Sequence, residues 1–244
     1  MFLASLAVLV GATVQASAGF GLALIAGPAL VAVLAPTEAV TTLLVLSTVT
    51  TALLLVVRRG PRPAVRWADV RAVTLAAVPG VLVGVLVLAA VSKAGLQLVV
   101  GVGVLAAVGL QVLRRPVAGR ATGSRWTTLG VGLTAGVLTT TTGTNGPPLA
   151  LWLERRGTTP AEMRDTLAVL FLALNVLGTA VLTASGRAGQ VLRPEVVLVL
   201  LAAAVAGHVV GRRLFHLLDV RCFRMAGLTL SALAGVASIA AAVG

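Results

Sequence analysis

Charged and aromatic side chains are scarce in this sequence. Of its 244 residues, only 11% are Asp, Glu, Lys or Arg and 3% are Phe, Trp or Tyr, whereas 58% are hydrophobic. Soluble domains carry roughly 25% charged residues, and no polar stretch here is long enough to build such a domain. The composition therefore predicts an all-α polytopic membrane protein, with room for about eight or nine segments of ~20 residues.

Other absences limit the chemistry that the chain can perform. The single cysteine, Cys222, excludes an internal disulfide and a cysteine-based metal cage. The sequence has no Gly-x4-Gly-Lys-Ser/Thr motif, so direct use of ATP is not expected. Neither a nucleophile–base pair nor a cluster of metal ligands is evident, which argues against an enzyme and against a resident metal or cofactor.

Negative charge is also sparse, with 7 Asp and Glu against 19 Lys and Arg, for a net charge of +12. In a soluble protein this excess would suggest nucleic-acid binding. Here the arginines lie in short loops beside apolar runs, as is typical of residues that fix membrane topology and contact anionic headgroups. The expected partner is therefore the lipid bilayer and not nucleic acid.

Two of the uncharged runs are too long for a single crossing. The runs are 1–37, 39–57, 72–92, 94–113, 126–153, 166–186, 196–211 and 225–244. Glycine and proline interrupt the two longest, and Pro147-Pro148 can start a helix but cannot continue one. Each is predicted to be two half-helices, joined near Gly19–Gly21 and near Gly143–Gly146. Because 1–37 has no Lys or Arg, we expect residues 1–18 to belong to the mature fold and not to a signal peptide.

The order of these features occurs twice, about 125 residues apart. A glycine-rich strip, a Pro-x-Glu segment and an uncharged run follow one another in each half. The spacing of Gly80 and Gly84 is repeated by Gly207 and Gly211, which predicts close helix packing within the chain, with a contact between two copies as the alternative. We expect a first transmembrane repeat at 1–115, a basic cytoplasmic linker at 116–125 and a second transmembrane repeat at 126–244.

The distribution of positive charge predicts how the two repeats are oriented. If each broken element enters and leaves on the same side, 16 of the 19 Lys and Arg residues lie on one side of the membrane, leaving Lys93, Arg187 and Arg193 on the other. If each crosses once, the division is 11 to 8. The positive-inside rule favours the first arrangement. It implies inverted repeats, each with a broken or re-entrant helical element plus three transmembrane helices, in the cytoplasmic membrane with both termini outside the cytoplasm.

The two broken elements are the predicted binding site. Half-helix N-termini offer unpaired N–H groups and partial positive charge, and inversion would bring the two strips together near the midplane. No Asp or Glu lies deep in an apolar run, and the polar residues near the strips are neutral. The candidate substrate-binding residues are Gln15, Ser17, Gly19, Phe20, Gly21, Thr141, Thr142, Gly143, Thr144, Asn145, Gly146 and Asn175. Asn145 is the leading candidate, since its amide can donate to an anionic oxygen.

Several of these residues have a structural alternative. The threonines of Thr139–Thr142 can hydrogen-bond back to their own helix or to a neighbouring one. Asn175, the counterpart of Thr51, can join helices or contact substrate. His208 fits a structural role better, whereas a proton relay there would make transport change steeply between pH 5 and 8.

The duplicated motifs resemble those of the sulfite exporter TauE/SafE family of membrane permeases. The resemblance rests on Ala18-Gly19-Phe20-Gly21 with Pro28 and on Gly143-Thr144-Asn145-Gly146-Pro147-Pro148, each followed by a helix start at Pro36-Thr37-Glu38-Ala39 or Pro160-Ala161-Glu162. It implies two related halves and the movement of sulfite, sulfonates and related small anions across the cytoplasmic membrane. In this sequence Phe20, Thr144 and Asn145 interrupt the glycine run of the family motif.

Together these observations predict a secondary transporter that moves a small anion, sulfite or an organosulfonate, by alternating access. The alternatives are a permease for another small solute or a cation, and a membrane scaffold subunit that transports nothing. The absence of buried carboxylates argues against a cation permease. A homodimer remains open through the glycine faces, and the sequence does not give the coupling ion.

Overall fold

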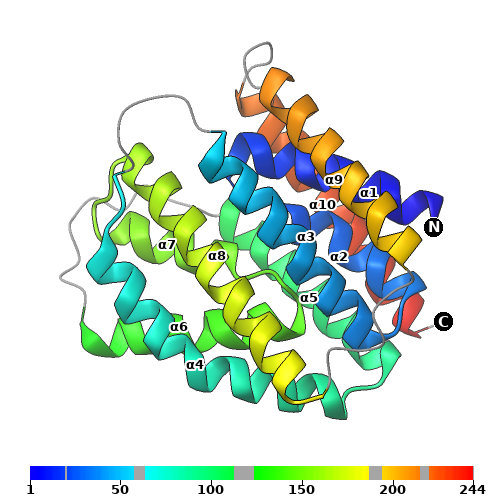
Figure 1. The fold of residues 1–244 in the computed structure, drawn as a ribbon, viewed down its shortest axis with the longest axis horizontal. Coiled ribbons are helices and arrows are strands. Elements are labelled where there is room, and N and C mark those ends of the chain that lie inside the picture. The colour runs from blue at the N-terminus through cyan, green and yellow to red at the C-terminus, as the bar shows by residue number, and fades with distance from the viewer. Residues whose placement is uncertain (20, 58–63, 113–123, 187–193, 215–219, 244) are drawn as a thin grey trace.

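A computed structural model describes residues 1–19, 21–57, 64–112, 124–186, 194–214 and 220–243 (Figure 1). Every helix or strand assigned within these ranges is an α-helix. The helices are α1 (Phe2–Ala18), α2 (Leu22–Val33), α3 (Pro36–Val56), α4 (Trp67–Ala90), α5 (Lys93–Val112), α6 (Arg125–Thr141), α7 (Gly146–Arg155), α8 (Pro160–Ala184), α9 (Pro194–Leu214) and α10 (Val220–Val243). The predicted all-α class is therefore confirmed for the described residues, and most of the expected 116–125 linker lies outside them.

Both long uncharged runs are broken where the glycines predicted. The first helix ends at Ala18 and the next begins at Leu22, while α6 ends at Thr141 and α7 begins at Gly146. Gly19 has φ 85° and Gly143 has φ 68°, a left-handed conformation that glycine adopts without steric cost. The two glycines stand 124 residues apart, so the chain turns in the same way at matching places in its two halves.

The helices that follow the breaks also begin alike. Pro36 and Pro160 stand in the first turns of α3 and α8, where a missing N–H costs nothing. The Glu38 carboxylate accepts from the N–H of the residue before α3 at 3.2 Å. The Glu162 carboxylate accepts from Thr159 N–H at 2.8 Å, and Thr159 Oγ1 accepts from Glu162 N–H at 3.3 Å, which completes a capping box. These acidic residues at the helix starts are accounted for as caps.

Length and composition suit several of the helices to crossing a membrane. Among the described residues, 5 segments are long and apolar enough, namely Pro36–Val56, Trp67–Ala90, Lys93–Val112, Pro160–Ala184 and Glu195–Arg213. Phe2–Ala16, Leu22–Val33 and Gly227–Val243 are apolar but shorter. Large apolar side chains cover the outer face of α4, where Leu75 is 72% exposed and Leu86 is 62% exposed. An outer surface of this kind suits hydrocarbon and not water.

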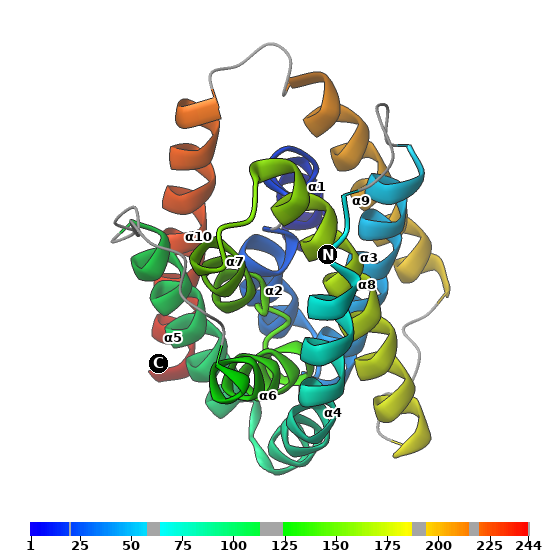
Figure 2. The same ribbon diagram turned by 90° about the vertical axis from the view of Figure 1, so that its left-hand side faces the viewer.

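Helices of the first half pack on helices of the second. The pairs are α1 with α9, α4 with α6, α5 with α10 and α3 with α8, and Figure 2 shows α4 beside α6 and α5 beside α10. In Figure 1 both chain ends lie on the right, at the same end of the bundle as the connection from α4 to α5. Helices α4 and α8 begin at the opposite end. The two halves of the chain are thus interleaved.

The spaced glycines make the closest of these contacts. A Cβ added at Gly80 would collide with Leu133 O of α6, and one added at Gly84 would lie 2.9 Å from Val137 O. On the other side of the molecule, Gly207 and Gly211 make the same kind of approach to main-chain oxygens of α1. The prediction of tight packing within one chain is confirmed at both pairs.

Candidate functional site

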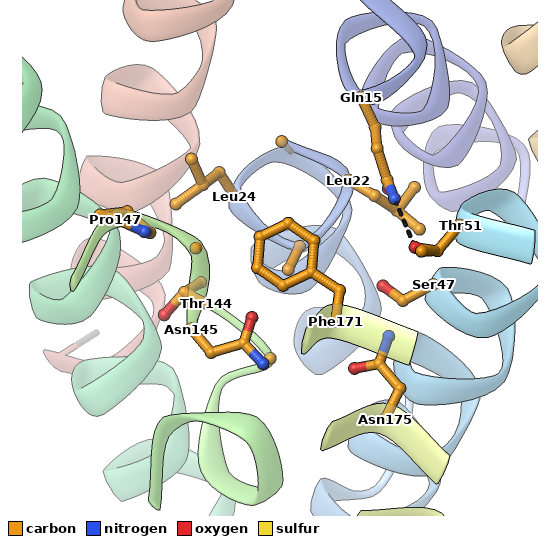
Figure 3. Close-up of a pocket in the computed structure, with 14 residues that line it drawn as sticks. Gln15, Leu22, Leu24, Ser47, Thr51, Thr144, Asn145, Pro147, Phe171 and Asn175 are labelled. Carbon is orange, nitrogen blue, oxygen red and sulfur yellow. Dashed lines mark hydrogen bonds between the residues drawn. The ribbon is translucent and has the colours of Figure 1, made fainter. Parts of the chain in front are cut away.

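A cavity lies where the two breaks meet α3 and α8 (Figure 3). Its empty space measures about 370 Å³, part of it open to the outside, and the centres of water molecules can occupy about 30 Å³ of it. Its lining residues are Gln15, Gly21, Leu22, Ala23, Leu24, Ser47, Thr51, Gly143, Thr144, Asn145, Gly146, Pro147, Phe171 and Asn175. The lining contains no charged side chain, and a volume of this size holds about two waters or one small ion.

The cavity brings together many of the predicted site residues from both halves of the chain. Those that line it are Gln15, Gly21, Gly143, Thr144, Asn145, Gly146 and Asn175. It also lies between two hydrophobic clusters of the core. One cluster contributes Leu22, Ala23 and Leu24, and the other contributes Phe171. The two broken strips therefore share one space, as the sequence predicted, and apolar packing surrounds it.

Of the remaining predicted residues, Gly19, Thr141 and Thr142 are described and do not line the cavity. Gly19 ends α1 and does not line the cavity. Thr141 Oγ1 donates to Val137 O at 2.8 Å and Thr142 Oγ1 donates to Leu138 O at 3.2 Å, so these hydroxyls bond back to their own helix. Neither threonine lines the cavity. Ser17 belongs to α1, but its side chain and all of Phe20 lie outside the described residues.

Asn145 stands at the entrance to α7, where it is the N-cap residue. Its Nδ2 donates to Thr139 Oγ1 at 2.7 Å, and Thr139 Oγ1 in turn donates to Ala135 O at 2.7 Å. The side chain is buried, with 4% of the residue exposed. Since Nδ2 carries two N–H bonds and Thr139 uses one, the other can donate to a bound anion.

Gln15 is held against α3 by its side-chain amide. Its Nε2 donates to Thr51 Oγ1 at 3.1 Å, while its Oε1 lies 3.3 Å from Thr50 Oγ1, whose one hydrogen is closer to Leu46 O, at 2.9 Å. Because Thr51 Oγ1 accepts here, its own hydroxyl hydrogen remains available to a ligand in the cavity. The role of Gln15 is thus to position Thr51 as well as to line the wall.

Asn175 is 4% exposed, and no hydrogen bond of its side chain is found within the described part of the chain. In Figure 3 the amides of Asn145 and Asn175 face one another across the cavity. A buried amide in an apolar helix needs a partner. Its position in the lining favours substrate contact over the alternative of joining helices.

The two half-helix N-termini differ in the donors that they offer. The N–H groups of Leu22, Ala23 and Leu24 belong to the first turn of α2, where no intrahelical acceptor exists. These three residues line the cavity, and their N–H groups have no acceptor within the described residues. At α7, Pro147 and Pro148 carry no N–H. The expectation of a helix N-terminus rich in N–H groups on both sides therefore holds for α2 and is wrong for α7.

Seven residues that line the cavity were not among the predicted site residues, namely Leu22, Ala23, Leu24, Ser47, Thr51, Pro147 and Phe171. Of these, Ser47 and Phe171 lie within apolar helices, away from the motifs. Each lies one turn before a polar lining residue, Thr51 on α3 and Asn175 on α8. The 124-residue offset that pairs Asn175 with Thr51 also pairs Phe171 with Ser47. If that offset is applied along the apolar helices as well as to the motifs, it identifies both residues.

Two other polar groups lie outside the cavity. His208 is 3% exposed and neither ring nitrogen has a hydrogen-bond partner among the residues that the structure describes, yet it is not part of the lining. At the start of α4, Asp69 pairs with Arg66 at 2.8 Å and with Arg156 at 3.0 Å, and the Arg156 guanidinium lies 4.9 Å from the centre of the Trp152 ring. The ion pair between Asp69 and Arg156 links the end of α7 to the start of α4. Within the described residues, no group of three or more His, Cys, Asp or Glu could hold a metal ion.

Comparison with known proteins agrees with the motifs. The family model of the sulfite exporter TauE/SafE matches residues 3–238, nearly the whole chain. Searches of curated proteins and of solved structures found no match. That family is one of transporters, and the apolar helices described above are those of a multi-pass membrane protein. The chain therefore belongs to the sulfite exporter TauE/SafE family.

Proposed function

We propose that this protein is a secondary transporter that carries a small anion, sulfite or an organosulfonate, across the cytoplasmic membrane by alternating access. The observation that carries the proposal is the uncharged, donor-rich cavity between the two breaks. Leu22, Ala23 and Leu24 at the start of α2, Thr51 and Asn145 line it, and each has an N–H or O–H that can donate to a ligand. Fixed neutral donors can replace the hydration shell of an anion without binding it so strongly that release is slow.

The two halves act as inverted repeats in this proposal. The matching φ angles at Gly19 and Gly143 support it, as does the exchange of partners in which α1 packs on α9 and α6 packs on α4. Alternating access then consists of rocking one set of helices against the other around the shared cavity. The arginine-bearing end faces the cytoplasm and the end with both termini faces outward, in keeping with the positive-inside rule.

Cation transport fits this site less well. Among the described residues no carboxylate lines the cavity, so the side-chain oxygens that a cation could use there are the neutral ones of hydroxyl and amide groups. The N–H and O–H hydrogens of the same side chains suit an anion. A scaffold subunit is the other alternative, and it is separated from a permease by activity of the purified protein alone.

The test is uptake of labelled sulfite and of methanesulfonate by proteoliposomes that contain only this protein, with and without pH and sodium gradients. Asn145→Ala removes one donor at the cavity, and Gln97→Ala removes a buried amide that does not line it. A hydrogen bond to a charged group contributes about 1.5–3 kcal/mol, so Asn145→Ala should lower kcat/KM roughly tenfold to a hundredfold. Gln97→Ala should keep most of the activity of the native protein.

The outcomes separate the hypotheses. Saturable uptake that Asn145→Ala abolishes or weakens supports an anion permease, and the gradient that changes the rate identifies the coupling ion. Equal uptake by Asn145→Ala and the native protein removes Asn145 from the site. No uptake by folded protein under any gradient rejects sulfite and sulfonate transport by this chain alone and favours a scaffold or another solute.

A further inference from the structure

The two long helices beside the breaks contribute unequal walls to the cavity. Thr51 of α3 and Asn175 of α8 are counterparts in the two halves, and both are polar. One turn earlier on the same helices the counterparts are Ser47 and Phe171. One position therefore places a small hydroxyl at the cavity where the other places an aromatic ring. This pair therefore differs in polarity as well as in size.

The Phe171 ring is held firmly in place. The residue is 5% exposed and belongs to the hydrophobic cluster that includes Leu149, Leu170 and Leu174. Figure 3 shows its ring in the middle of the lining residues, on the side toward α2. Ser47, in contrast, is half-buried, and no hydrogen bond of its hydroxyl is found within the described residues. Phe171 thus gives the cavity a buried apolar surface, and Ser47 beside it on α3 has a hydroxyl that can donate.

The Phe171 ring limits how an anion can lie in this space. Its carbons offer no N–H or O–H to an anionic oxygen and pack favourably against alkyl groups. The donors at Ser47, Thr51 and Asn145 attract those oxygens. A sulfonate in the cavity would thus direct its charged headgroup toward the donors and its alkyl carbons toward Phe171. Water centres can occupy only about 30 Å³, so an alkyl tail on the headgroup must pack against the Phe171 ring.

We infer that Phe171 is the specificity-determining residue of this site, limiting the transported anion to an oxyanion headgroup with no tail or a tail of one or two carbons. The inference rests on the proposed function and narrows its substrate class. Ser47, the counterpart on α3, is the smaller side chain, so the limit is set by α8. Discrimination by one methylene against a hydrophobic surface of a site is about tenfold or more.

The test is competition of unlabelled methane-, ethane-, butane- and hexanesulfonate with labelled sulfite uptake. In the native protein, methanesulfonate and ethanesulfonate should compete and the two longer sulfonates should not. Phe171→Ser installs the residue found at the counterpart position. The concentration of butanesulfonate needed to inhibit sulfite uptake should then be at least about tenfold lower than for the native protein. Phe2→Ser is the matched control, since Phe2 is 80% exposed and remote from the cavity lining, and it should leave the length limit unchanged.

A second variant approaches the limit from α3, in case Phe171→Ser folds poorly. Ser47→Leu should slow sulfite uptake, because it removes one donor, and its larger apolar side chain should abolish competition by ethanesulfonate. Stabilisation of the detergent-solubilised protein by each sulfonate gives a readout that does not need transport. A length limit that is the same in the native protein, Phe171→Ser and Ser47→Leu overturns the role of Phe171 while leaving anion transport intact. Absence of both sulfite uptake and anion stabilisation in the native protein overturns the proposed function and this inference together.

Discussion

Replacing Gly84 by alanine tests the interleaved packing directly, because this glycine lies where α4 approaches α6. The added Cβ would lie 2.9 Å from Val137 O and closer still to Thr140 Oγ1, whereas ordinary van der Waals contact begins at 3.4 Å. The helices must therefore separate locally by at least about 0.5 Å, or the Thr140 side chain must rotate away. Rotation would break the hydrogen bond that Thr140 Oγ1 donates to Val81 O at 3.3 Å.

The expected cost follows from three contributions. Overpacking a well-filled contact costs about 1–3 kcal/mol, and loss of the Thr140 hydrogen bond costs about 1 kcal/mol. Alanine has a higher helix propensity than glycine, which returns about 1 kcal/mol. The Gly84→Ala protein should therefore be less stable by about 1–3 kcal/mol. In a thermal denaturation experiment on the protein in detergent, this loss should lower the midpoint by several degrees.

Gly130→Ala is the matched control for this measurement. Gly130 also lies on the α4–α6 pair, on α6, but nothing lies within 4 Å of a Cβ built there. Its substitution should leave the midpoint unchanged or raise it slightly. Gly211→Ala, where the Cβ would lie 2.9 Å from Ala16 Cβ, should behave like Gly84→Ala. Equal midpoints for Gly84→Ala and Gly130→Ala would refute the predicted contact.

Two further predictions concern the breaks and the charged group at the start of α4. Gly143→Ala should reduce both stability and uptake more than Gly19→Ala. Both glycines have positive φ, which alanine adopts only with strain. At Gly143 the added Cβ would also collide with Leu43 Cδ2, at 2.6 Å, whereas no such contact is found at Gly19 within the described residues. Circular dichroism melts and sulfite uptake measure this, and the opposite ranking would contradict it. Asp69→Asn should lower the free energy of unfolding by about 2 kcal/mol. The substitution leaves Arg156 unpaired beside Trp152, with only 23% of the Arg156 side chain exposed. Glu195→Gln, at an exposed helix start, is the control in the same melts, and equal midpoints would show that the ion pair contributes nothing.

The local features of the fold could be predicted from the sequence because each depends on a few neighbouring residues. Positive φ at Gly19 and Gly143, and the proline starts of α3 and α8, follow from what glycine and proline permit. The location of the site follows from them, since both breaks line one cavity.

The remaining features depend on contacts between distant segments. Nothing in the four-threonine run shows that Thr141 and Thr142 bond to carbonyls of their own helix, because a hydroxyl can rotate to whichever acceptor the fold supplies. The place of Phe171 in the cavity depends on how α8 packs on α3. Both prolines of α7 are evident in the sequence. That they reduce the number of N–H groups offered to the cavity becomes clear only once the first turn of α7 is known to line it.

The contact between α1 and α9 also determines when the protein can finish folding. Thr13 Oγ1 donates to Gly207 O at 3.0 Å across 194 residues of chain. At a synthesis rate of about 5–20 residues per second, α1 leaves the ribosome about 10–40 s before its partner does. Throughout that interval the face of α1 that receives Gly207 and Gly211 has no helix against it. Packing of α1 is thus delayed until α9 has been inserted. A chain released before α9 would expose this face of α1 to the quality-control proteases of the membrane.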